Sequence, residues 1–375
     1  MIAGSGHPVE ERQVPHGKSC RKSGRANPLP ATIHTGDEGF GREYQPTKAF
    51  FSFGTTWIAP LPVGLLRNVE KRMKKTVYLI EYAVIRSVSF FLNLLPLSLA
   101  LYLARPIGFL LFLLLGRSRR MALDNIRQAY SSEKSESEIR EIARGAFIHL
   151  TEFGVEWLSM PRMIRHPEHY LVTVHRGDQV QAALQKGKGA IVLVCHTGNW
   201  EIMALMGGLL VARPVGASVY ALARPLKNPY LYEYALRLRG GMGLKSIEKG
   251  GGVRETLNCL KENGIVCILM DQRVSEGSIE TNFFGRPALT TSLPIIAALR
   301  LGTPVFFNFL HRTNDCHYTM SVEGPLSIES TGNVRTDIQV NTQRFVDRIE
   351  TEIRKKPIHW LWMHNRWRPQ HGSKD

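Results

Sequence analysis

The order of apolar and polar positions divides the chain into two regions. Between residues 77 and 115 apolar side chains follow one another with few interruptions, and residues 87–104 carry no charge. A helix that spans a membrane needs about 20 apolar residues, and the uncharged run nearly reaches this length by itself. After residue 135 short apolar runs alternate with amphipathic stretches, which is typical of a soluble α/β domain.

The second region predicts a regular succession of helices and strands. The period of its apolar positions predicts helices at 135–159, 200–211, 228–239, 253–262, 292–301 and 337–356. Strands are expected at 190–195, 218–223, 265–270 and 305–309, with a candidate edge strand at 318–322. Because most of these strands are apolar throughout and helices separate them, the expected fold is α/β. It has a mixed, largely parallel sheet covered by helices on both faces.

The first region predicts a membrane-anchoring helical segment over residues 73–116, placed before the α/β fold. Basic side chains flank it, among them Lys74 and Lys75 on one side and Arg119 and Arg120 on the other. Under the positive-inside rule both ends favour the cytoplasmic side. This suits a hairpin or a monotopic pair of helices at least as well as a single crossing. A buried hairpin of a soluble protein is the alternative.

Residues 1–72 differ from the rest of the chain. Gly, Pro and Ser interrupt them, and no helical or strand period lasts two turns. Met73 reads like the start of a membrane protein, so 1–72 is predicted to be a disordered extension or the result of a start assigned too far upstream. A poorly ordered N-terminal arm is the alternative. An α/β domain over 117–368 and a tail over 369–375 complete the expected organisation.

Composition adds an electrostatic constraint. The chain has 48 Lys+Arg against 32 Asp+Glu, a formal net charge of +16. The excess is spread through the predicted domain and favours an anionic partner, such as lipid headgroups, phosphorylated sugars or an acidic protein. A basic nucleic-acid-binding protein is a competing interpretation, but no reader motif supports it and the apolar segment argues against it, so no nucleic acid is expected as partner.

The five cysteines form neither a metal site nor a disulfide framework. Their number is odd, and neither a CxxC pair nor a Cys/His spacing typical of metal ligands occurs. Three lie in or beside apolar segments, where a free thiol behaves as a small hydrophobe. The sequence therefore predicts a reducing compartment, no metal and no cofactor.

The most informative motif is HTGNWE at residues 196–201. The strand before it delivers His196 to its carboxyl end, where open α/β sheets bind ligands. Gly198 allows a tight turn, Asn199 is a good N-cap, and Glu201 falls in the first turn of the next helix. We expect the Glu201 carboxylate to hold one ring nitrogen of His196, so that the other takes a proton from a hydroxyl. The alternative is that His196 caps the helix and Glu201 serves only its dipole.

No serine or cysteine nucleophile accompanies this motif. The GxSxG signature is absent, and Cys195 belongs to the apolar strand. An alcohol has a pKa far above 7 and needs a base before it attacks a thioester. The motif therefore favours direct transfer to a hydroxyl without a covalent acyl-enzyme. A non-catalytic membrane scaffold is the other competing class, and the intact motif weighs against it.

Several ordered blocks resemble one family. H-x4-E is similar to the H-x4-D/E pair of glycerolipid-type acyltransferases, and KGAIVLVCHTGNWE resembles the lipid A biosynthesis (late, lauroyl/myristoyl) acyltransferase family. Further blocks resemble that family: Asp124-Asn125-Ile126, ARPLKNP at 223–229, Asp271-Gln272 with FFGRPA at 283–288, and WLWMHNRW at 360–367. The resemblance runs from about residue 73 to 368.

The resemblance implies an acyltransferase of lipopolysaccharide biosynthesis at the cytoplasmic face of the cell inner membrane. It implies transfer of a fatty acyl chain from acyl carrier protein to a hydroxyl of a lipid A precursor, an anionic glycolipid. His196 and Glu201 are the implied catalytic pair. Substrate contacts are expected from Asn199, Arg224, Asp271, Gln272 and Arg286, the arginines because they bind phosphate bidentately.

Some assignments stay open. Arg224 and Arg286 equally suit ordinary salt bridges, and Asp271 either orients an acceptor or pairs with Arg224. The sequence GNWE also occurs in relatives that acylate other glycolipids, such as the phosphatidylinositol mannosides of actinobacteria. The acceptor, the acyl chain length and the choice of acyl carrier protein over acyl-CoA are therefore not determined at this level.

Overall fold

A computed structural model describes most of the chain. The described residues are 63–130, 133–166, 170–223, 225–241, 243–248, 252–274, 277–314 and 317–367. Residues 1–62, most of the predicted extension, lie outside them. Residues 61–375 belong to one compact unit. Helix α1 (Val63–Leu94) begins upstream of residue 73, where the apolar segment was expected to start.

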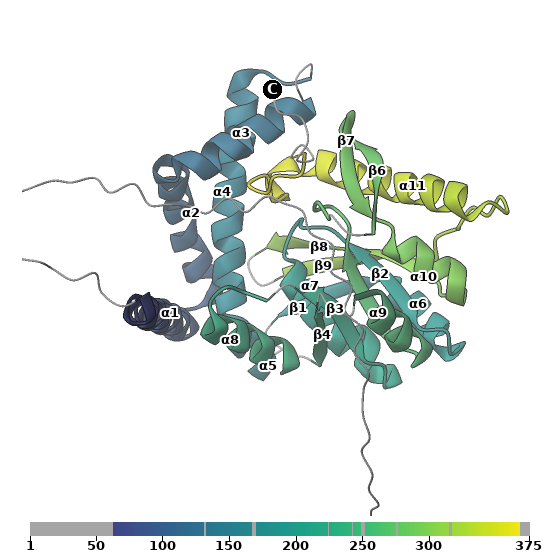
Figure 1. Ribbon diagram of the computed structural model, residues 1–375, viewed down its shortest axis with the longest axis horizontal. Helices are drawn as coiled ribbons and strands as arrows, with labels where there is room; N and C mark the ends of the chain where they lie inside the picture. Colours follow the sequence, from purple (N-terminus) through teal and green to yellow (C-terminus); the bar gives the residue numbers. More distant parts are fainter. Residues whose placement is uncertain are drawn as a thin grey trace, which may run out of the picture. The chain divides into compact units, whose positions relative to one another are not determined.

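Seven strands of the described residues form one mixed sheet (Figure 1). They are β1 (Leu171–His175), β2 (Ala190–Val194), β3 (Val219–Ala223), β4 (Leu244–Glu248), β5 (Ile265–Leu269), β8 (Val305–Asn314) and β9 (His317–Glu323). Their order is β1-β9-β8-β2-β5-β3-β4. Strands β8, β2, β5, β3 and β4 are parallel, β9 is antiparallel to β8, and β1 is parallel to β9. The expected α/β fold is confirmed.

Helices cover both faces of this sheet, and the central strand β2 shows why its sequence is apolar throughout. Ile191 and Leu193 join a core with α3 (Gly116–Tyr130), α4 (Glu136–Leu158), α9 (Gly252–Lys261), α10 (Leu293–Leu301) and α11 (Val334–Lys355). Val192 and Val194 join a second core with α2 (Leu97–Leu114), α5 (Met160–Arg165), α6 (Gly177–Gln185) and α7 (Trp200–Gly207). Alternate side chains therefore enter opposite layers, as a strand's two-residue period requires.

Local capping signals place the helix starts close to their predicted positions. Ser135 caps α4 in a reciprocal capping box with Glu138. Asn228 caps α8 (Pro229–Gly240), whose first residue is a proline. The helix predicted at 200–211 is α-helical only to Gly207 and continues as a π-helical segment, Gly208–Ala212.

The prediction of an edge strand at 318–322 is wrong. Strand β9 lies between β1 and β8, and its alternate residues are buried. Alternating apolar and polar residues are typical of a strand with one face open to solvent. In β9 they arise because the two faces of the strand are covered to different extents. The actual edge strands are β1 and β4. Both are short and contain polar residues, so the search for apolar runs did not detect them. The hairpin of β6 (Ser278–Phe283) and β7 (Arg286–Thr291) was also missed.

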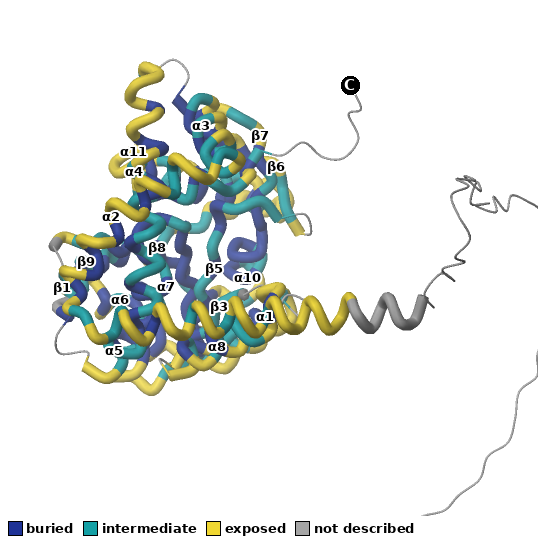
Figure 2. Tube along the Cα trace, turned by 90° about the vertical axis from the view of Figure 1, so that its left-hand side faces the viewer, coloured by how far each residue is buried: buried dark blue, intermediate teal, exposed yellow. Residues whose placement is uncertain are grey.

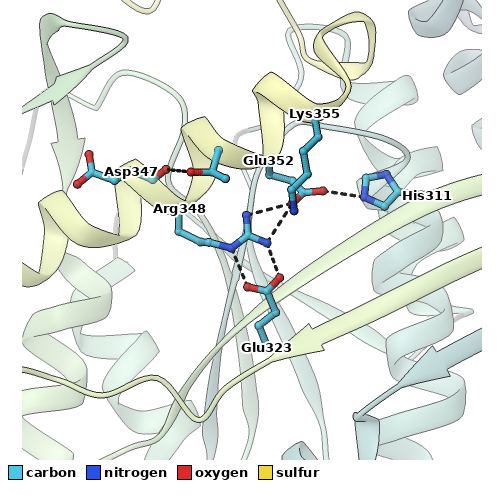
Figure 3. A network of polar contacts seen from close by, with 7 residues as sticks. His311, Glu323, Asp347, Arg348, Glu352 and Lys355 are labelled. Atoms are coloured by element: carbon cyan, nitrogen blue, oxygen red, sulfur yellow. Dashed lines mark hydrogen bonds and ion pairs between the residues drawn. The ribbon is translucent and has the colours of Figure 1, made fainter.

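An ion network fastens α11 to the sheet (Figure 3). Glu352 of α11 accepts hydrogen bonds from His311 of β8 at 2.9 Å and from Arg348 at 3.0 Å. Arg348 also donates to Glu323 of β9 at 2.8 Å. Burial alone would raise the pKa of Glu352, but these donors and Lys355 lower it to about 2. Helix α11 is thereby held beside β8 and β9, on one side of β2.

Candidate active site

The turn after β2 presents His196 at the carboxyl end of the sheet. Gly198 has φ of +61°, and a Cβ there would lie 2.2 Å from the Leu310 carbonyl oxygen. Only glycine meets both requirements without displacing the neighbouring strand. The His149 ring nitrogen Nε2 lies 3.2 Å from the Gly198 carbonyl oxygen. Because burial lowers the pKa of His149 to about 4, its neutral ring can donate this hydrogen bond and hold the turn from behind.

Asp271 is the carboxylate that holds His196. Strands β2 and β5 pair with Val194 opposite Leu269, so the residues two positions further on, His196 and Asp271, also face each other. The His196 Nδ1 atom lies 2.9 Å from Asp271 Oδ1, and its backbone N–H donates to Oδ2 at 2.8 Å. The pairing of adjacent strands, rather than proximity along the chain, therefore chooses the partner of the histidine.

A third donor completes the setting of Asp271. The indole N–H of Trp360 donates to Asp271 Oδ2 at 2.7 Å, and the Leu361 backbone N–H donates to the His196 carbonyl at 3.2 Å. Burial would raise the pKa of Asp271, but His196 and Trp360 outweigh it and hold the pKa below its ordinary value. Asp271 is therefore an anion at neutral pH. An anionic acceptor at Nδ1 places the ring proton there and leaves Nε2 as the basic nitrogen.

The hydrogen bond expected between Glu201 and His196 is not formed. Glu201 instead makes a two-point ion pair with Arg239 of α8, with Arg239 Nε 3.1 Å from Glu201 Oε2. Helix α7 leads away from the turn, so its first carboxylate faces α8 rather than the imidazole. This corrects the predicted geometry, whereas the catalytic role of Glu201 stays a prediction.

Asn199 serves the turn itself. Its side-chain oxygen accepts from the Ile202 N–H at 3.0 Å, which caps α7 as expected. Its amide nitrogen donates to Glu156 at 2.7 Å. Glu156 is buried and also accepts from the Tyr318 hydroxyl at 2.8 Å. Since both ends of the Asn199 amide are used within the protein, the geometry gives no support to its predicted contact with substrate.

A long apolar cavity opens beside His196. Its volume is about 380 Å³, and Trp200, Glu201, Arg239 and Gln272 line it together with His196. Most of its other lining residues are apolar, among them Val192, Val194, Val219, Leu244 and Ile265 of the sheet and Met203 of α7, while Thr291 and Asn308 add two polar side chains. Val219, Leu244 and Ile265 begin their strands, whereas His196 follows the end of β2. The cavity therefore runs the length of the sheet from the imidazole.

The remaining predicted residues lie in three different settings. Gln272 is a cavity residue, as its place after Asp271 suggested. Arg286 sits on the β6–β7 hairpin with its guanidinium 5.8 Å from the Trp367 ring centroid, and it does not line the cavity. Arg224 lies outside the described residues. The buried thiol of Cys195 has a pKa well above its ordinary value because of its burial, which opposes thiolate chemistry there.

Sequence reasoning missed two polar residues of the site, Arg239 and Trp360. Arg239 ends an amphipathic helix, where a basic residue looks like an ordinary complement to the helix dipole. Trp360 belongs to the WLWMHNRW block, for which no role in the site was predicted from the sequence. The residue is 3% exposed, and its indole donates to the carboxylate that holds His196.

A histidine held by a buried carboxylate beside an apolar cavity is an arrangement that suits an enzyme acting on an apolar substrate. Residues 67–369 match the family described as bacterial lipid A biosynthesis acyltransferase. The chain belongs to this family, which confirms the resemblance seen in its sequence and makes an acyltransferase the expected activity.

Two curated relatives are also named as acyltransferases. The phosphatidylinositol mannoside acyltransferase of Mycobacterium tuberculosis strain H37Rv is 25% identical over 194 residues, 51% of this chain and 58% of the relative. That of Mycolicibacterium smegmatis is 25% identical over 194 residues, 51% of this chain and 60% of the relative. The match thus spans under two thirds of these relatives.

Proposed function

We propose that this protein transfers a fatty acyl chain from a thioester to a hydroxyl of an anionic glycolipid at a membrane surface. The observation that carries the proposal is the position of His196, between a buried carboxylate and the end of a long apolar cavity. A base alone would suit many reactions. A base at the end of a channel for hydrocarbon suits acyl transfer.

The proposed chemistry uses His196 as a general base. Nε2 takes the proton of the acceptor hydroxyl while the hydroxyl oxygen attacks the thioester carbonyl carbon. The tetrahedral intermediate collapses, the carbon–sulfur bond breaks, and the imidazolium returns the proton to the leaving thiolate. Asp271 keeps Nδ1 protonated throughout and stabilises the transient positive charge on the ring. The products are an ester and a free thiol, with no acyl-enzyme.

The cavity supplies the acyl subsite in this proposal. Its walls follow strands of five residues, which at about 3.3 Å per residue corresponds to roughly 17 Å of depth. Saturated chains have no polar groups to satisfy, so apolar side chains are sufficient to bind them. Each buried methylene contributes about 0.8 kcal/mol. The Glu201–Arg239 pair places charge in a mostly apolar wall. We propose that this pair contacts the thioester end of the bound acyl chain.

The substrates follow from the family and the charge. We propose acyl carrier protein as donor, since an acidic carrier suits a chain with a formal net charge of +16. The family favours a lipid A precursor as acceptor, at the cytoplasmic face of the inner membrane. The mycobacterial relatives favour a second candidate, a phosphatidylinositol mannoside. Arg224 and Arg286 are the proposed ligands for acidic groups of the acceptor.

Mass spectrometry of the products tests this proposal. The purified protein in lipid vesicles receives acyl carrier protein thioester or acyl-CoA, and each candidate glycolipid in turn. We expect one added acyl ester on one glycolipid, absent with His196→Ala. Thioester hydrolysis without an acylated glycolipid, at equal rates in the wild type and His196→Ala, would contradict the proposal.

A further inference from the structure

Helix α1 has an inverted distribution of polarity. The side that faces the protein carries its polar anchors: Ser89 Oγ donates to the Leu158 carbonyl at 2.8 Å, and Asn93 Nδ2 donates to the same carbonyl at 2.9 Å. The exposed side is mostly apolar and includes Val77, Ile80, Val84, Val88, Phe90, Phe91 and Leu94. Glu81 and Arg86 are also exposed, but both turn toward α8: Glu81 accepts a hydrogen bond from Asn228, and Arg86 lies over the Tyr234 ring. A helix on a water-soluble protein shows the reverse arrangement. The outer face of α1 is therefore built for an apolar surrounding.

Helix α2 is fastened to the α/β domain along its length. It buries small residues against α4, and a Cβ at Gly108 would lie 2.6 Å from the Ile148 Cα. Halfway along, Arg105 pairs with Glu152 of α4 at 3.0 Å. The opposite face exposes large apolar side chains, among them Leu99, Tyr102, Leu103, Ile107, Leu110 and Leu114. A crossing α2 would carry α4 and its polar surface into the hydrocarbon, which is unfavourable.

Helices α1 and α2 do not form a hairpin. Figure 1 shows α1 end-on, whereas α2 runs in the plane of the page, and each packs mainly on α4 or α8 rather than on the other. Their exposed faces lie on the same side of the unit, the one turned to the viewer in Figure 2. Two helices in different directions cannot both cross a bilayer, although each has the length and composition for it. A crossing by α1 alone would carry the start of α8 into the hydrocarbon, because Asn228 donates to the Tyr78 carbonyl and to Glu81 of α1.

Basic side chains border this apolar surface. Lys71, Arg72, Lys74 and Lys75 are exposed where α1 becomes apolar, and Arg117 and Arg120 are exposed where α2 ends. Such clusters attract anionic headgroups, each residue near the surface strengthening the attraction. The charge pattern selects a lipid bilayer over a second copy of this basic chain as the occupant.

We infer that α1 and α2 lie within one leaflet of an anionic bilayer and that neither crosses it. This monotopic docking surface consists of the apolar faces of α1 and α2 and their basic borders. It concerns the mode of attachment and does not depend on the proposed acyl transfer.

Probe accessibility tests the inference. Ser98 is exposed at the start of α2, beside the α1–α2 connection, and Glu133 is exposed in the connection from α3 to α4. Ser98→Cys and Glu133→Cys, each in the full chain, receive a fluorophore quenched by dithionite, which does not cross membranes. The labelled unsubstituted protein measures background from its own cysteines. Both variants are reconstituted into vesicles of phosphatidylethanolamine and phosphatidylglycerol.

We expect dithionite outside the vesicles to quench the same fraction of probe at both positions, and the same fraction in a third variant, Lys71→Cys, whose label lies before the apolar part of α1. Protection of position 98 to the extent that position 133 is quenched would show that α2 crosses the bilayer, and the same result for position 71 would show that α1 crosses it. Either outcome would overturn the inference.

A binding measurement checks the surface independently of topology. Ile80→Glu combined with Leu110→Glu should weaken sedimentation with the same vesicles by about tenfold or more, since two apolar contacts are lost. The matched control is Val253→Glu, which changes a similarly exposed apolar residue on α9 and should bind as the wild type does. Unchanged vesicle binding of the double variant would overturn the inference. So would a wild type that is a dimer without vesicles together with a double variant that is a monomer, since the apolar surface would then bind a second copy of the chain.

Discussion

Two carboxylates lie near the end of β2 but have different partners. Asp271 follows β5 and holds the ring and backbone of His196, while Glu201 begins α7 and holds Arg239. Glu201 is close to His196 along the chain, whereas Asp271 is far from it. The comparison teaches that a strand-end histidine takes its partner from the neighbouring parallel strand, because matched strand ends meet at one edge of the sheet.

The largest effect is expected from His196→Ala. Removing the proposed general base should reduce acyl transfer by about 10²–10⁴-fold, the usual contribution of positioned acid–base catalysis. The residue lies at a turn, so the fold should persist. Product formation is measured with folded protein, checked by its circular dichroism and thermal midpoint. Turnover near that of the wild type would show that His196 is not catalytic. The comparison of Asp271 with Glu201 as its partner would then say nothing about catalysis.

Asp271→Asn should come close to that loss. An amide at this position can donate to Nδ1 and so favour the wrong tautomer of His196, with roughly 10²-fold or greater loss of turnover. Folding should weaken by about 1–3 kcal/mol, since one of three buried donors loses its acceptor. Turnover and urea denaturation in detergent micelles measure the two effects. An unchanged rate would show that the Asp271 pair is only structural.

The same variant gives a pH test with a defined sign. The folded pKa of Asp271 lies below its ordinary value, so its ionisation stabilises the folded state above the unfolded pKa, about 3.9. This contribution is lost as the pH falls through the folded pKa. The stability difference between wild type and Asp271→Asn should therefore be constant near neutral pH and shrink in acid. A difference that grows on acidification would reverse the assignment.

Glu201→Gln should have a smaller effect than Asp271→Asn. The substitution leaves the His196 tautomer intact and removes only the ion partner of Arg239, so we expect a loss of turnover of about tenfold or less. The double variant with Arg239→Met should lose little more than the worse single variant, because the two residues act as one unit. If Glu201→Gln instead reduced turnover as much as His196→Ala does, the result would favour the pair of His196 and Glu201 that was predicted from the sequence over the pair of His196 and Asp271.

The smallest effect, counted per methylene of the donor, concerns the cavity beside His196 and Glu201. Ala221 lines it in the middle of β3, and Ala221→Phe would shorten the available space. For each methylene excluded, kcat/KM for a long donor should fall roughly fourfold, the equivalent of about 0.8 kcal/mol. Short donors should react as before, which is the internal control. A uniform loss for all chain lengths would show that the acyl chain binds elsewhere.

Much of the fold was predictable because its signals are local. The apolar runs of β2 and β5, the helices that begin near Ser135 and Asn228, and the strand–turn–helix around His196 depend on a few residues each, and the structure confirms them. The edge strands and the hairpin were missed since their stability comes from pairing rather than from their own apolar content. The position of β9 was wrong for the same reason, because strand order is not encoded in the strand itself.

By itself the sequence determined that a histidine stands at the end of a buried parallel strand, that a long apolar segment precedes the α/β domain, and that the surface is basic. These properties depend on the composition and period of single segments. Only the tertiary structure decided that Asp271 rather than Glu201 holds the histidine, that Arg239 and Trp360 join the site, and that α1 turns its apolar face outward. Each of these depends on which elements become neighbours, and that choice is made by the packing of the whole unit.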